Sequence, residues 1–252
     1  MKLRYNNPGI QHSIDSIMLF LEGDYSEYWF ESSLYFYPQI DKGKLCSFNS
    51  LQKRDYLLEV LNGVVEFEAI KQKVISYQKY WDSKSFSIQK ALEDTFDLNL
   101  SDKFNDLIGN ITLNPICPRF LDERRFDVFY LNSEKGALGM AIHEIIHFVW
   151  FYVWNCHFKD DKREYENPHI KWIFSEMVVD TIMRKDKRLY SINPYFESGC
   201  AYDYFYTMKI DGTPVLDILQ RLFEDNNILL FMEKGYEYCL VHEKEIRNQI
   251  KK

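Results

Sequence analysis

The sequence contains few of the residues that interrupt regular structure. Its 252 residues include only ten Gly and seven Pro, and it has neither an internal repeat nor a low-complexity segment. Hydrophobic residues make up 46% of the chain, charged residues 27% and aromatic residues 17%. This composition excludes disordered and collagen-like classes and is typical of a globular protein with enough chain to build a hydrophobic core.

Clustered positive charge is also missing. The net charge is −7, and no sustained run of Lys and Arg occurs. Because neutralising phosphates requires such clusters, nucleic acid is not expected as a partner. The first residues, MKLRYNNPGIQHSIDSIMLFLEG, lack the charged, apolar and cleavage regions of a secretory signal in their usual order.

Cysteine is sparse, and its spacing is uninformative. The chain has an odd number of cysteines with no Cys-x-x-Cys pair: Cys46, Cys117, Cys156, Cys200 and Cys239. Reduced thiols in a cytoplasmic protein fit this pattern best.

The most distinctive stretch covers residues 133–156, SEKGALGMAIHEIIHFVWFYVWNC. Ser133 is a suitable N-cap, Glu134 suits the first turn of a helix, and no proline intervenes. Nearly every position from 137 to 154 is apolar, which predicts a helix buried on most sides. The polar residues in its middle argue against a membrane span, so no membrane partner is expected.

Those polar residues form the pattern His143-Glu144-Ile-Ile-His147. Residues four apart share a helix face and lie about 6 Å apart along the axis, so both imidazoles can reach one Zn²⁺ ion. Glu144 lies beside that position and can take a proton from a water molecule that the metal activates. A satisfied core histidine is the plain alternative. Two histidines at this spacing around a glutamate favour a metal site, because an apolar helix otherwise excludes such groups.

A catalytic zinc site normally needs a third protein ligand. The metzincin extension would require Gly at 150 and His at 153, where the chain has Trp150 and Val153. The next predicted helix, from Pro168 to Lys185, carries Glu176 and Asp180 one turn apart in an apolar stretch. Glu176 can supply the third ligand, and Asp180 can accept the outer N–H of a ligand imidazole. An acidic stripe on a solvated face is the alternative interpretation.

Four other residues lie closer to His147 in sequence and compete with Glu176 for this role: His157, Glu164, Glu166 and His169. The first three fall in a polar stretch that is expected to be a surface loop, and the last falls in the first turn of the next helix. Ligands of catalytic metals need rigid supports, which favours Glu176.

The pattern His143-Glu144-x-x-His147 followed by Glu176-x-x-x-Asp180 resembles the zincin metallopeptidases of the gluzincin branch. The resemblance covers about residues 126–185. It implies that His143, His147 and Glu176 bind one zinc ion per chain and that Glu144 is the general base. It also implies that Asp180 orients a ligand without binding the ion itself. The gap between the second and third ligands is longer than in thermolysin-like enzymes, which leaves room for an inserted loop at 155–166.

The same resemblance implies two further features. A Tyr or His after the third ligand would stabilise the oxyanion, and the candidates are Tyr202, Tyr204, Tyr206 and His242. The strand at 126–131 would be an edge strand along which an extended peptide lies. In a chain with 18 Tyr, each single tyrosine candidate is more simply explained as structural.

The predicted fold is α+β and mostly helical. Residues 1–108 are expected to form a helical N-terminal region, with helices at 87–96 and 101–108, packed on a zincin-like catalytic domain at 109–252 with a small sheet. The predicted function is that of a zinc metallopeptidase acting on a peptide or protein substrate. The alternatives are a zincin-fold metal-binding protein that does not turn over substrate, and a helical interaction protein in which the motif is coincidental.

Overall fold

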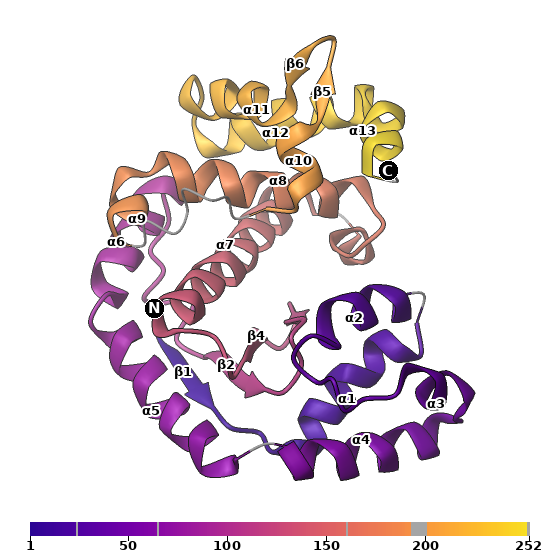
Figure 1. Ribbon diagram of the computed structural model, residues 1–252. Coiled ribbons are helices and arrows are strands. Elements are labelled where there is room, and N and C mark those ends of the chain that lie inside the picture. The colour runs from indigo at the N-terminus through magenta and orange to yellow at the C-terminus, as the bar shows by residue number, and fades with distance from the viewer. Residues whose placement is uncertain (24, 65, 160, 193–200, 251–252) are drawn as a thin grey trace. The chain divides into compact units, whose positions relative to one another are not determined.

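The computed structural model describes residues 1–252 except 24, 65, 160, 193–200 and 251–252 (Figure 1). Two compact units each combine two stretches of chain. Unit 1 comprises Met1–Ser83 and Phe104–Ala141, and unit 2 comprises Lys84–Lys103 and Ile142–Lys252. The division predicted after residue 108 differs from this one and falls inside a strand, β2 (Leu107–Thr112). The predicted fold class, mostly helical α+β with a small sheet, is confirmed.

Unit 1 combines a mixed four-stranded sheet with helices. The sheet has the order β1-β2-β4-β3, in which β1, β2 and β4 are parallel and β3 is antiparallel to β4. Besides β2, the elements of unit 1 are β1 (Leu3–Asn6), α1 (Ile10–Leu21), α2 (Ser26–Ser33), α3 (Lys42–Ser47), α4 (Ser50–Val64), α5 (Phe67–Asp82), β3 (Arg119–Phe120), β4 (Arg125–Phe129) and the first turns of α7 (Glu134–Phe158).

Two sequence-based expectations about this sheet are wrong. No helix forms at 101–108, because β2 begins at Leu107 and pairs with both β1 and β4, contacts that a local pattern does not reveal. β4 is not an edge strand along its whole length either. The chain turns back at Arg124, whose φ is 49°, and so pairs Arg119 with Phe126 and Phe120 with Arg125.

A row of polar side chains crosses the three parallel strands. Asn6, Asn110 and Asp127 are register neighbours, and Asn110 Nδ2 lies 3.5 Å from Asp127 Oδ1. Asp127 is fully buried, and its Oδ1 lies 2.9 Å from Nε2 of His12 on α1. Since a buried carboxylate is costly without such partners, this row fixes α1 on one face of the sheet.

Unit 2 is built from helices and a small two-stranded ribbon. Its elements, together with α7 from residue 142 onward, are α6 (Ser85–Phe96), the short 3-10 helix η1 (Lys162–Tyr165), α8 (Ile170–Lys185), α9 (Lys187–Ile192), α10 (Asp203–Thr207), β5 (Lys209–Ile210), β6 (Thr213–Pro214), α11 (Val215–Glu224), α12 (Ile228–Val241) and α13 (Glu243–Ile250).

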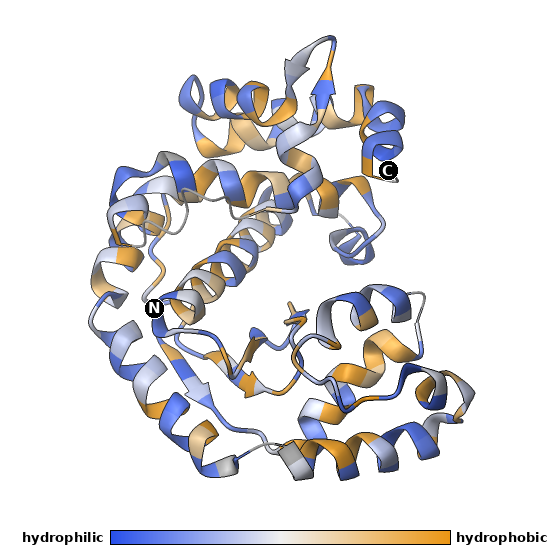
Figure 2. Cartoon of the chain, in the orientation of Figure 1, coloured by the Kyte–Doolittle hydropathy of each residue, from blue (hydrophilic) through white to orange (hydrophobic). Residues whose placement is uncertain are grey.

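The long helix predicted at 133–156 is confirmed as α7, with 25 residues. Ser133 caps it, because its Oγ accepts a hydrogen bond of 3.0 Å from the Gly136 N–H. Most of α7 is orange or pale in Figure 2, and blue segments interrupt it. Among the described residues it is the one helix long and apolar enough to cross a membrane, with a mean hydropathy of 1.3 over its best window. That window is 72% buried, as in the core helix of a globular protein.

Aromatic side chains from α7, α8 and α12 form the core of unit 2. The ring centroids of Trp150 and Phe174 are 5.3 Å apart, and those of Phe174 and Phe231 are 5.9 Å apart. This packing fixes α8 against α7. The helix begins at Ile170 rather than at Pro168, because His169 still has an extended backbone and serves as the N-cap residue.

Four of the five cysteines lie within the described residues and are free thiols: Cys46, Cys117, Cys156 and Cys239. Cys239 is buried in α12, and burial raises the pKa of its thiol, which makes this thiol unreactive. Cys200 lies outside the described residues.

Gly235 allows α12 to approach α8 closely. A Cβ atom added there would lie 2.5 Å from Cζ of Phe174, a fully buried ring two residues before Glu176. Gly235→Ala is therefore expected to lower the free energy of unfolding by about 1–3 kcal/mol, because the ring or the helix must shift. Urea unfolding followed by circular dichroism measures this change.

Gly63 in α4 provides the matched control. Nothing lies within 4 Å of a Cβ atom added at this exposed helical glycine. Gly63→Ala is expected to raise the free energy of unfolding by about 0.5–1 kcal/mol through helix propensity alone. Equal effects of the two substitutions would contradict the close approach of α12 to Phe174.

Candidate metal site

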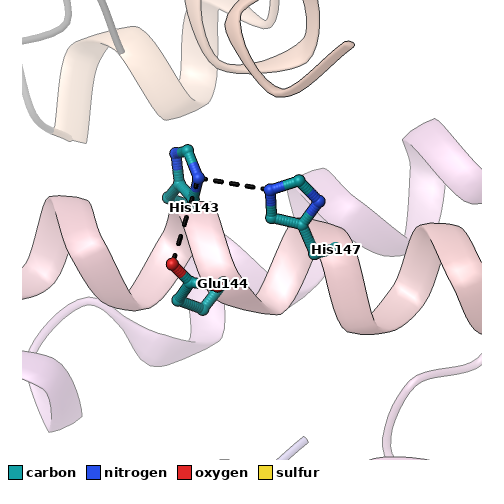
Figure 3. A group of neighbouring side chains, drawn as sticks. All are labelled: His143, Glu144 and His147. Carbon is teal, nitrogen blue, oxygen red and sulfur yellow. Dashed lines mark hydrogen bonds and ion pairs between the residues drawn. The ribbon is translucent and has the colours of Figure 1, made fainter. Parts of the chain in front are cut away.

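Three polar side chains of α7 converge in unit 2. The imidazoles of His143 and His147 lie on one side of the helix, and their Nε2 atoms are 3.2 Å apart (Figure 3). The carboxylate of Glu144 lies beside them, with Oε1 3.9 Å from Nε2 of His143. All three ligand atoms lie within 4.8 Å of one another, so this group can hold a metal ion.

Burying these polar side chains costs free energy unless they bind a ligand or contact one another strongly. His147 is fully buried, Glu144 is 4% exposed, and the side chain of His143 is 19% exposed. The surrounding positions of α7 are apolar, so water cannot solvate the group from most sides. A small molecule can reach the group from the side on which His143 is exposed to solvent.

Glu176 of α8 faces the same two imidazoles. Its Oε1 lies 3.3 Å from Nε2 of His147, and its Oε2 lies 3.5 Å from Nε2 of His143. Burial by itself would raise the pKa of the Glu176 carboxyl. The electrostatic interaction with His147 and the hydrogen bonds with both imidazoles outweigh burial and hold this pKa well below its usual value. The group is therefore a carboxylate, the form that binds metal ions.

Asp180 lies one turn after Glu176 and is 2% exposed. Its Oδ1 accepts a hydrogen bond of 2.5 Å from the hydroxyl of Tyr206, and its Oδ2 lies 3.2 Å from Nε of Arg184. Neither partner was predicted from the sequence. The predicted contact of Asp180 with an imidazole N–H stays a prediction.

The residues that competed with Glu176 lie in other environments. His157 is exposed near the end of α7, ten residues after His147, which corresponds to about 15 Å along the helix. Glu164 is ion-paired with the buried Lys171. Glu166 and His169 are exposed before the start of α8.

The four oxyanion candidates lie near α10 and at the end of α12. Tyr202, Tyr204 and Tyr206 lie in or next to α10, and the rings of the first two stack with centroids 5.3 Å apart. His242 follows α12, where its Nδ1 lies 3.7 Å from Glu245 Oε1. The hydroxyl of Tyr206 donates a hydrogen bond to Asp180, a residue predicted to belong to the site.

Comparisons with known proteins identify no family. No family model matches the chain, and no curated protein and no solved structure matches it. The resemblance to gluzincins therefore rests on the residues themselves: a buried His143-Glu144-x-x-His147 group on a helix.

Proposed function

We propose that this chain is a zinc-dependent metallopeptidase. The observation that carries the metal assignment is the spacing between His143 Nε2, His147 Nε2 and the carboxylate of Glu176, which ranges from 3.2 to 3.5 Å. At roughly 2.0–2.1 Å per bond, two ligands of a tetrahedral zinc ion lie about 3.3–3.4 Å apart. The two imidazole nitrogens have this spacing, and the carboxylate of Glu176 faces them with one oxygen toward each.

The chemistry of these donors supports the same assignment. Two protonated imidazoles with Nε2 atoms 3.2 Å apart would repel each other, whereas two neutral imidazoles can share one divalent cation. The buried carboxylates of Glu144 and Glu176 would then face a positive ion. His143, His147 and Glu176 would bind the ion and leave its fourth position open for catalysis.

A zinc ion held there would polarise a peptide carbonyl and make a water molecule acidic enough to lose its proton. Glu144 would accept that proton, because its carboxylate lies beside the two imidazoles while Glu176 offers a third ligand from α8. The water oxygen forms a bond to the carbonyl carbon. As the C–N bond breaks, Glu144 passes the proton to the amine nitrogen. Burial of Glu144 keeps bulk water from competing in these transfers.

The choice of a peptide bond as the substrate rests on the resemblance to gluzincins, whereas the metal rests on geometry. A metal-binding protein without turnover would have the same ligands. Glu144 argues for turnover, because a structural zinc ion has no use for a buried base beside it.

The test uses protein purified without a histidine tag and a mixture of internally quenched peptides. We expect hydrolysis that 1,10-phenanthroline abolishes and that equimolar Zn²⁺ restores after the chelator is removed. A chain that binds zinc but cleaves none of the peptides would favour the alternative, a binding protein. Hydrolysis that the chelator leaves unchanged would contradict the proposed mechanism.

A further inference from the structure

Tyr206 connects α10 to the helix that carries Glu176. Its hydroxyl donates a hydrogen bond of 2.5 Å to Oδ1 of Asp180 and accepts one of 3.0 Å from the N–H of Ala201. A hydroxyl that both donates and accepts has its proton directed at the carboxylate. The Tyr206 hydroxyl thus holds one oxygen of the buried Asp180 carboxylate in place.

Arg184 holds the other oxygen. Its Nε lies 3.2 Å from Asp180 Oδ2, one turn along the same helix, and its guanidinium carbon lies 5.5 Å from the centroid of the Tyr206 ring. Arg184 and Tyr206 therefore support each other as well as Asp180. Two charge-assisted contacts at the two oxygens fix the rotation of this carboxylate about its side-chain bonds.

We infer that Tyr206 is a positioning residue for the metal site and that it acts through Asp180. This inference rests on the proposed function, because Asp180 is expected to orient a ligand imidazole. A carboxylate that supports a ligand sets metal affinity by its direction as well as by its charge. Asp180 lies one turn from Glu176 on α8, and both side chains are buried, so water screens the charge of Asp180 only weakly from the ligand set.

This role differs from that of the oxyanion-stabilising residue expected from the gluzincin resemblance. The Tyr206 hydroxyl is directed at Asp180 and does not need to touch a substrate. Its removal should change metal binding even when no substrate is present. That separates a positioning residue from a catalytic one.

The experiment measures zinc affinity by competition with a chromophoric chelator. Tyr206→Phe, which removes only the hydroxyl, is expected to weaken zinc binding about 5- to 10-fold, less than the about 10- to 100-fold expected for Asp180→Asn. The visible spectrum of the Co²⁺-substituted protein should shift in both variants, because ligand directions change. Arg184→Gln, which releases the other oxygen, should act in the same direction and gives a second variant should Tyr206→Phe fold poorly.

Tyr238→Phe is the matched control. The Tyr238 hydroxyl is buried in unit 2 and has no hydrogen-bond partner among the described residues. The same chemical change there should leave zinc affinity and the Co²⁺ spectrum as they are in the wild type. It also shows whether loss of any buried tyrosine hydroxyl in this unit disturbs the site.

A double-mutant cycle decides whether Tyr206 acts through Asp180. In the Asp180→Asn background, Tyr206→Phe should produce no further loss of zinc affinity. An equal loss in both backgrounds would overturn the inference, as would wild-type affinity in the Tyr206→Phe protein. In either case the proposed function stands, because the wild type still binds zinc. If the wild-type protein binds no zinc, both the inference and the proposed function are wrong. The measurement on the wild-type protein shows this by itself.

Discussion

Protein purified without added metal or a histidine tag is expected to contain about one zinc ion per chain, whereas His147→Ala is expected to contain almost none. His147 is fully buried, and its Nε2 lies within 3.3 Å of both His143 and Glu176. Truncating it removes one of the three proposed ligands and leaves a buried cavity in its place. Elemental analysis of the purified proteins measures the zinc content directly.

His143→Ala and Glu176→Ala should lose zinc in the same way. His157→Ala and His169→Ala provide matched controls, because both histidines are exposed and lie away from the converging side chains. Their zinc content should equal that of the wild type. Retention of zinc after loss of Glu176, combined with loss of zinc in either control, would assign the third ligand to that control histidine instead.

The part of the candidate site that was easiest to predict from the sequence lies within a single helix. His143, Glu144 and His147 lie on one helix, and the helical repeat alone brings them together. Glu176 was found by a different route, through its place in a second apolar helix. Its distance from the imidazoles depends on how α8 packs on α7, and the aromatic core around Phe174 determines that packing.

The partners of Asp180 could not be predicted. Tyr206 lies 26 residues away in sequence, in a chain with 18 tyrosines, and nothing in its surroundings separates it from Tyr202 or Tyr204. Each of the three lies in or beside the same short helix. A hydrogen bond at this separation depends on the path of the chain between two helices, which residue types alone do not specify.

The errors in the fold have a similar origin. The segment 101–108 was expected to be helical because Ser101 can cap a helix. Leu107 and Ile108 instead enter β2, where neighbours from residues 3–6 and 125–129 pair with them. Pairing between distant segments overrides weak local preference. The same cause divides both compact units into two stretches of chain, so that no single cut along the sequence separates them.

Glu144→Gln is expected to keep its zinc and its fold but to lose hydrolysis of any peptide substrate by about 10²-fold or more. The amide has nearly the shape of the carboxylate, and Glu144 is not needed to complete the ligand set of His143, His147 and Glu176. It cannot accept a proton from water, however, and it cannot return one to the leaving amine. The expected loss therefore appears in kcat, while zinc content stays at the wild-type value.

The measurement pairs kcat with zinc analysis on the same preparation, so that loss of the base is not confused with loss of the metal. Glu233→Gln is the control, because this glutamate is exposed on α12 and the same chemical change there should leave both quantities unaltered. Wild-type kcat in the Glu144→Gln protein would place the base on another residue. A fall in zinc content equal to the fall in kcat would make Glu144 a ligand, with Glu176 then free to serve as the base. The ratio of the two losses thus assigns the two buried glutamates their separate roles.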